Sequence, residues 1–175
     1  TVGSRAGQTR NPYDTERNPG GSSGGTGAAV AASFAAVGMG SDTCGSIRIP
    51  SAHNNLTGLR GTQGLSSRDG VFPLSHTQDI AGPMARSVTD LALVLDATVG
   101  SDPADPATAD ADANIPISYV TGLDAGALAS ARVGVLRGYV RQGPEDDAVG
   151  AVFDGAMEDQ ARLGAEVEVV AVDGL

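Results

Sequence analysis

Two serine-containing segments could carry nucleophilic chemistry, and 24 positions separate their serines. The first is the run Gly20-Gly21-Ser22-Ser23-Gly24-Gly25, and the second is Ser41-Asp42-Thr43-Cys44-Gly45-Ser46. A serine hydroxyl becomes an effective nucleophile only when a base lies within hydrogen-bonding reach. Successive backbone N–H groups around a serine at the start of a helix can also stabilise an oxyanion. The same serines suit caps and turns, so the residues alone leave both interpretations open.

The glycine-rich run does not match the known phosphate-binding loops. A P-loop needs a lysine, and all 11 basic residues of this 175-residue chain are arginines. The dinucleotide-binding motif needs a third glycine where Val30 stands, and a strand before the first glycine. The run also matches G-x-S-x-G, but residues 14–19 are unsuited to the buried strand that must precede a nucleophile elbow.

Bases and metal ligands are scarce in this sequence. The chain has two histidines, His53 and His76, and one cysteine, Cys44. Either histidine could serve as the base of a Ser-His-Asp hydrolase, but we favour local hydrogen bonding for both. Three such residues are too few to predict a metal site, and we expect no cofactor. A single cysteine also excludes an intrachain disulfide.

The charge distribution argues against a nucleic-acid partner. Residues 101–175 hold 14 acidic residues and 4 arginines, whereas residues 1–100 hold 7 of each, so the net charge of −10 comes from the second part. Phosphate contacts need clustered positive charge. No apolar run approaches the roughly 20 residues that a membrane helix needs. We expect neither nucleic acid nor membrane as a partner, and take a cytoplasmic location as the default.

Hydrophobic periodicity and turn residues predict an α/β fold. The expected elements in the first part are an irregular loop at 1–20, a small-residue helix at 26–37 on which another backbone packs closely, a strand at 38–42, a short helix at 45–53, a strand at 56–64, and a loop at 65–86 broken by Pro73 and Pro83. The clearest helix is 87–99, where Ser87 and Asp90 form a capping box. Its apolar face consists of Val88, Leu91, Ala92 and Leu95.

The remaining residues divide into a connector and a compact unit. Residues 101–130 are acidic and contain proline, and we expect 100–116 to be exposed. Residues 131–175 form a predicted β-α-β unit. Its elements are a strand at 132–136, a helix at 145–163 and a strand at 165–172. We therefore predict one incomplete domain, with residues 1–100 as its core.

Five segments together resemble the amidase signature family. They are the two serine-containing segments extended over 20–32 and 40–52, then Gly58-Leu59-Arg60, Gly64-Leu65-Ser66-Ser67-Arg68-Asp69-Gly70, and Asp79-Ile80-Ala81-Gly82-Pro83-Met84-Ala85-Arg86-Ser87. The resemblance is specific over about residues 7–100 and weaker over 131–175. It implies a central mixed β-sheet with helices on both faces. It also implies hydrolysis of a carboxylic amide to an acid and ammonia or an amine.

In that family a Ser–cis-Ser–Lys triad performs the reaction, and the resemblance assigns two of its members by position. Ser46 would be the nucleophile that forms the acyl-enzyme, and Ser22 would relay its proton. A cis peptide bond is expected between Ser22 and Ser23. The implied oxyanion hole consists of the backbone N–H groups of Thr43, Cys44 and Gly45, together with that of Ser46.

Three further residues would support the two segments, namely Ser23, Asp42 and Arg48. For Arg48 we weigh contact with a substrate carboxylate against an ion pair that holds the loop, and we favour the ion pair. Cys44 stands where many members have glycine. Its side chain either narrows the floor of the site or is an inert small residue, and we favour the second.

The triad's lysine is missing from this chain. In the family it lies several dozen residues before the glycine-rich run, whereas this chain begins 21 residues before Ser22 and contains no lysine. Arginine is too basic to serve as a neutral base. The absence of an initiator Met also predicts that the chain lacks its natural N-terminal segment, and a C-terminal part as well. The 175 residues alone are expected to be inactive.

Other functions remain as alternatives. In the tRNA-dependent glutamyl/aspartyl amidotransferase, the glutamine-hydrolysing A chain usually has Gln where Ile49 stands, and Leu-Lys-Pro where Leu59-Arg60-Gly61 stands, which favours a stand-alone amidase. A catalytically dead family member could act as a binding protein. The expected partner is a small-molecule amide, and a homodimer is a further hypothesis.

Overall fold

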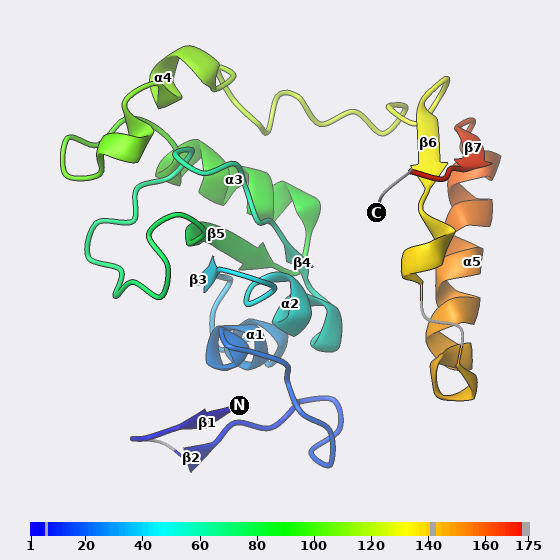
Figure 1. Ribbon diagram of the computed structural model, residues 1–175, viewed down its shortest axis with the longest axis horizontal. Helices are drawn as coiled ribbons and strands as arrows, with labels where there is room; N and C mark the ends of the chain where they lie inside the picture. Colours follow the sequence, from blue (N-terminus) through cyan, green and yellow to red (C-terminus); the bar gives the residue numbers. More distant parts are fainter. Residues whose placement is uncertain (6, 141–142, 173–175) are drawn as a thin grey trace. The chain divides into compact units, whose positions relative to one another are not determined.

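The computed structural model describes residues 1–5, 7–140 and 143–172, which form two compact units. The first unit is residues 1–122 and the second is residues 123–175. Figure 1 shows helices and strands in both units, which confirms the predicted α/β class. The strands form an antiparallel pair β1–β2, an antiparallel sheet of three strands, and a parallel pair β6–β7.

The three-stranded sheet has the order β3-β5-β4 and forms the centre of the first unit. Strand β3 (Val37–Asp42) matches the predicted strand and runs antiparallel to β5 (Ile80–Ala85). Their register places Asp42 opposite Ile80. Residues that follow β3 therefore lie beside residues that precede β5. This register brings the segment that ends at Ser46 next to Asp79.

Three helices cover this sheet. Helix α1 (Gly24–Ala31) and helix α3 (Val88–Thr98) both contact β3 and β5, and Figure 1 draws them on opposite sides of the sheet. Helix α2 (Arg48–His53) packs against α1 and the short strand β4 (Thr57–Gly58). The buried apolar core between these elements consists of Val30, Ile47, Ile80, Met84, Ala85, Ala92 and Leu95.

Helix α3 begins as its capping box predicts. The Ser87 hydroxyl accepts a hydrogen bond from the backbone N–H of Asp90 at 3.1 Å and donates to the Asp90 carboxylate at 2.8 Å. The bonds hold the first turn of the helix, where backbone N–H groups lack helical partners. Ala92 and Leu95 of the predicted apolar face are buried, whereas Val88 is 54% exposed.

The prediction of a loop over 65–86 is wrong at its end, because Pro83 lies within β5. A proline in a central strand normally removes one hydrogen bond of the ladder. Here the carbonyl of Pro83 accepts a hydrogen bond from the N–H of Leu59, just beyond the end of β4. The nitrogen of Pro83 therefore faces the side where β4 has ended. No hydrogen bond to β3 is lost.

The predicted helix at 26–37 is shorter in the structure. Helix α1 ends at Ala31, and Ser33 adopts a left-handed conformation with φ of 61°, which stops the helix before Val37 enters β3. The predicted close packing is present at Gly27. A Cβ atom there would lie 3.0 Å from Asn54 Nδ2 and 3.2 Å from Pro50 Cβ.

Two other predicted segments differ in extent. The strand expected at 56–64 has only the two residues of β4. The expected irregular loop at 1–20 includes the two-residue strands β1 (Val2–Gly3) and β2 (Gly7–Gln8).

The second unit is the predicted β-α-β unit. Strand β6 (Arg132–Val135) pairs in parallel with β7 (Glu166–Val169), and helix α5 (Asp147–Arg162) connects them. Two short 3-10 helices, η2 (Arg137–Tyr139) and η3 (Pro144–Asp146), precede α5. None of the described helices is both long and apolar enough to cross a membrane.

The expectation of exposure over 100–116 is wrong for part of that segment. It contains the 3-10 helix η1 (Pro106–Thr108) and the short helix α4 (Ala111–Asn114). Asp105 and Thr108 are only 7% and 0% exposed. Asp105 is buried because Arg68 binds its carboxylate through two guanidinium nitrogens, both at 2.9 Å.

Candidate active site

The tertiary structure brings the two serine-containing segments together. The backbone N–H of Ser23 donates a hydrogen bond to the carbonyl oxygen of Ser46 at 3.2 Å. Gly20 allows this approach, because its φ is +71° and a Cβ atom there would lie 3.0 Å from both the nitrogen and the Cα of Pro50. Only glycine fits both the left-handed conformation and the small space.

Adjacent Ser22 and Ser23 have different surroundings. The Ser23 hydroxyl donates to the carbonyl of Ser41 and accepts from its N–H, both at 3.2 Å, so it joins the glycine-rich run to β3. Ser22 is exposed and Ser46 is half-buried. Within the described part of the chain, neither the Ser22 nor the Ser46 hydroxyl has a hydrogen-bond partner. Both remain free to interact with a substrate or a base.

The cis peptide bond of this segment lies between Gly21 and Ser22. The predicted position, between Ser22 and Ser23, is therefore wrong by one residue. A cis bond brings consecutive Cα atoms to about 2.9 Å, compared with about 3.80 Å in the trans form. Glycine relieves this crowding because it has no Cβ atom, and the bond between two serines would not benefit in this way.

Asp42 organises the segment that leads into α2. It is completely buried, and its carboxylate accepts backbone hydrogen bonds from Gly45 at 2.7 Å, Ile47 at 3.1 Å and Arg48 at 3.3 Å. The carboxylate therefore holds the turn on both sides of Ser46.

Two arginines neutralise this buried carboxylate. The Arg48 guanidinium binds both Asp42 oxygens at 3.1 Å, which is the ion pair favoured from the sequence, and Arg60 Nε lies 3.4 Å from Oδ1. Burial opposes ionisation of Asp42, but the hydrogen bonds from Arg48 and from the loop N–H groups outweigh it and hold its pKa well below the usual range. The role of Arg60 was not anticipated, although the residue belongs to the quoted motif Gly58-Leu59-Arg60.

The N–H groups of the expected oxyanion hole are not equivalent. That of Gly45 donates to Asp42, which corrects its inclusion among the free donors. Those of Thr43, Cys44 and Ser46 have no acceptor within the described residues. The segment thus alternates between N–H groups that hold the turn and N–H groups that are available to a ligand.

Asp79 is a second carboxylate that contacts this segment. Its Oδ1 accepts a hydrogen bond from the Thr43 hydroxyl at 2.6 Å, and the residue is 6% exposed. This hydroxyl contact, with the N–H groups of Ser75 and Leu74 and the nearby Arg68, lowers the pKa of Asp79. Sequence reasoning missed Asp79, whose only signal was its place in the motif that begins Asp79-Ile80-Ala81.

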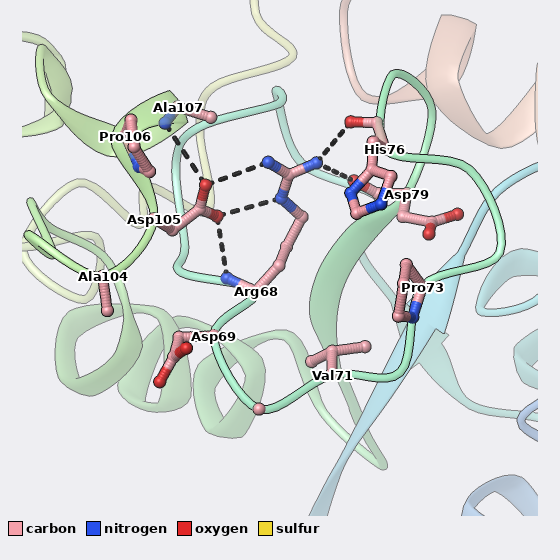
Figure 2. A pocket seen from close by; sticks show the side chains of 11 residues that line it. Arg68, Asp69, Val71, Pro73, His76, Asp79, Ala104, Asp105, Pro106 and Ala107 are labelled. Atoms are coloured by element: carbon pink, nitrogen blue, oxygen red, sulfur yellow. Dashed lines mark hydrogen bonds and ion pairs between the residues drawn. The ribbon is translucent and has the colours of Figure 1, made fainter.

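Figure 2 shows a cavity of about 480 Å³ with Asp79 in its wall. The Arg68 guanidinium lies in this cavity, but its nitrogens bind Asp105 and the carbonyl oxygens of His76 and Asp79. A guanidinium with all of these partners holds loops together and offers little to an anionic ligand. We therefore assign Arg68 a structural role.

Asn54 joins the two segments from behind. It is completely buried, and its Nδ2 donates to the carbonyls of Pro19 and Pro50, both at 2.7 Å. One carbonyl lies just before the glycine-rich run and the other lies in α2, close after Ser46. No pattern in the sequence distinguished Asn54 from its neighbour Asn55.

The histidines lie away from these contacts. His53 is exposed and its Nδ1 lies 3.2 Å from Asn18 Oδ1, while His76 is exposed and its carbonyl accepts from Gln63 and Arg68. No hydrogen bond between a histidine and a serine occurs among the described residues, and these residues contain no cluster of potential metal ligands. Cys44 is exposed.

Comparisons with known proteins agree over nearly the whole chain. The sequence profile of the Amidase family matches residues 1–175. The chain is 42% identical to the A chain of the Glutamyl-tRNA(Gln) amidotransferase of Gloeobacter violaceus, covering 97% of this chain and 34% of that protein. It is 44% identical to AtzE, a component of the 1-carboxybiuret hydrolase of Pseudomonas sp., covering 97% and 35%.

Solved structures lead to the same group. The peptide amidase from Stenotrophomonas maltophilia superposes with a TM-score of 0.82 and 42% identity, over 95% of this chain and 34% of that chain. The present chain therefore spans about a third of the length of the relatives that it matches.

Proposed function

Since this chain belongs to the Amidase family, we propose that it forms part of an enzyme that hydrolyses a carboxylic amide. The observation that carries the proposal is the hydrogen bond from the Ser23 N–H to the Ser46 carbonyl, which joins two segments with free serine hydroxyls. Such an arrangement suits a serine nucleophile with a second serine as proton carrier.

We assign the attack on the amide carbonyl carbon to Ser46. Its proton passes to Ser22 while the proton of Ser22 passes to the base. The oxyanion that forms is stabilised by the N–H groups of Thr43, Cys44 and Ser46, because that of Gly45 is held by Asp42. The C–N bond then breaks as the departing nitrogen receives a proton through the same relay. Water hydrolyses the Ser46 ester and releases the acid.

The base in this proposal is a lysine outside these 175 residues. A neutral lysine amine can take up a proton and return it, whereas an arginine remains charged. Ser23, Asp42 and Arg48 hold the two segments and take no part in proton transfer. The chemistry needs no metal or cofactor.

The test compares the isolated chain with the longest protein that its gene encodes. Ammonia or amine release from simple amides is measured for both, each with Ser46 intact and with Ser46→Ala. We expect hydrolysis only in the longer protein, and only with Ser46. Hydrolysis by the isolated chain that depends on Ser46 would overturn the assignment of the base. Loss of that activity in His53→Ala or His76→Ala would instead indicate a Ser-His-Asp mechanism.

A second candidate is glutamine hydrolysis within an amidotransferase, supported by 42% identity to the A chain of such an enzyme. Ile49 and Arg60 depart from the residues usual in that chain. Hydrolysis of simple amides without tRNA or a partner protein would favour the stand-alone amidase. A longer protein that binds amides without hydrolysing them would be a binding protein. Sedimentation of the same samples tests the hypothesis of a homodimer.

A further inference from the structure

The Asp79 carboxylate joins two loops that are distant in the sequence. Its Oδ1 accepts the Thr43 hydroxyl at 2.6 Å, and its Oδ2 accepts the N–H groups of Leu74 and Ser75, both at 2.8 Å. The N–H of Asp79 donates to the carbonyl of Ser75 at 2.9 Å. The side chain is therefore anchored to the loop that lines the cavity, and its remaining contact holds Thr43.

The sheet register explains why this contact falls beside Ser46. Asp42 is the last residue of β3 and stands opposite Ile80, the first residue of β5. The next residue along the chain is Thr43, and the one before Ile80 is Asp79. Both are carried by a buried pair of strands, so their relative position depends on the core of the first unit.

Two carboxylates thus hold the segment between β3 and α2 at different points. Asp42 binds the N–H groups of Gly45, Ile47 and Arg48, on the side that leads into α2. At the other end of the segment, the contact recorded for the side chain of Thr43 is its hydrogen bond to Asp79. Without Asp79, Thr43 and the adjoining peptide would lose this fixed point.

We propose that Asp79 is a positioning residue, which holds Thr43 so that the N–H groups of Thr43 and Cys44 face the forming oxyanion. The inference rests on the proposed amide hydrolysis and concerns the same site. Asp79 acts through Thr43 and exchanges no proton with the substrate. Its contribution therefore appears in the rate of the chemical step and little in substrate binding.

The test uses the longest protein that the gene encodes, with variants at both ends of the contact. Thr43→Val removes the hydroxyl at nearly constant shape, Thr43→Ser retains it, and Asp79→Ala removes the acceptor. We expect Asp79→Ala and Thr43→Val each to lower kcat roughly 10- to 100-fold, as displaced oxyanion donors do, with KM changed less than about threefold. Thr43→Ser should stay within about threefold of the wild type. The double variant should be no slower than the worse single variant.

Asp69→Asn is the matched control, because Asp69 is an exposed acidic residue that lines the same cavity. Its kcat and KM should equal those of the wild type. A rise in KM for Asp79→Ala with unchanged kcat would overturn the inference, since it would mark direct substrate binding. Additive losses in the double variant would also overturn it, because the two residues would then act separately.

A second measurement is independent of catalysis. Hydrogen exchange at the amides of residues 43–46 should be faster in Asp79→Ala than in Asp69→Asn, while exchange in α3 stays the same. Equal exchange at 43–46 in the two variants would overturn the inference. Failure of the proposed function would show differently, as a wild-type protein that releases no ammonia or amine. In that case the exchange result alone decides whether Asp79 holds the segment.

Discussion

The backbone N–H of Ser23 lies 3.2 Å from the carbonyl oxygen of Ser46 and donates a hydrogen bond to it. This bond links a glycine-rich run that precedes α1 to the turn that precedes α2. It involves only main-chain atoms, so the contact leaves the side chains of Ser22 and Ser46 free. The two candidate catalytic hydroxyls are therefore brought into one region by backbone atoms.

The two neighbouring serines should separate activity from stability. Ser22→Ala is expected to lower kcat by roughly 10²- to 10⁴-fold, the usual contribution of a proton-transfer group, with the melting temperature unchanged. Ser23→Ala should instead destabilise the fold by about 1 kcal/mol, because both backbone groups of Ser41 lose their partner. Kinetics and thermal unfolding of the two variants check this. Equal kinetic losses in both would contradict the assignment of Ser22 as the relay.

Removal of the Asp42 charge should loosen the turn around Ser46. Asp42→Asn is expected to reduce the free energy of unfolding by about 2 kcal/mol or more, because a buried acceptor of charged hydrogen bonds is lost. Arg48→Lys should cost less, since lysine keeps the charge but cannot bind both oxygens at once. Urea unfolding measures both effects. A larger loss for Arg48→Lys than for Asp42→Asn would show that the guanidinium, and not the carboxylate, organises the turn.

Acid should unfold this protein partly through Asp105. Its hydrogen bonds with Arg68 hold its pKa well below the usual range, despite the opposing effect of burial. The folded-state pKa lies below the unfolded value of about 3.9, so the stabilisation is complete above about pH 5 and is lost as the pH falls towards the folded-state pKa. Asp105→Asn should be less stable than the wild type at about pH 7, and the difference should shrink on acidification to about pH 2. Unfolding curves whose separation stays constant with pH would contradict this.

Two glycines of the same run should respond in opposite ways to alanine. At Gly20 the φ is +71° and a Cβ atom would lie 2.9 Å from Ile49 Cγ2, so Gly20→Ala should destabilise by about 1–3 kcal/mol and lower activity. Gly25 lies in α1 with open space around its Cβ position, so Gly25→Ala should stabilise by up to about 1 kcal/mol. Thermal unfolding checks both signs. Equal tolerance at the two positions would contradict the close approach at Gly20.

Local signals predicted some elements well and failed where tertiary contacts intervened. The capping box at Ser87 and the alternation of 131–175 depend on near neighbours, and α3 and the β-α-β unit follow them. Pro83 predicts a break, but its nitrogen faces the open side beyond β4, so the strand continues. That geometry depends on a partner strand more than twenty residues away. A local rule therefore could not supply it.

The candidate site shows the same division. Ser22, Ser23, Asp42 and Ser46 could be named because their types and spacing form a pattern. Asp79, Asn54 and Arg60 could not be assigned roles, since each acts through a partner that is 18 to 36 positions away for at least one contact. Gly45 illustrates a finer limit, because only the structure shows that Asp42 occupies its N–H.

The sequence by itself determined the α/β class, the family resemblance, the residue types available for chemistry and the absence of lysine, because these depend on composition and on order along the chain. The tertiary structure decided which groups meet. It placed Ser23 against Ser46, gave Asp42 two arginines and set Asp79 beside Thr43. Those contacts follow from the register of β3 with β5 and from the close packing at Gly20 and Gly27. Both arise from burial of a shared core, which short-range patterns in the chain do not specify.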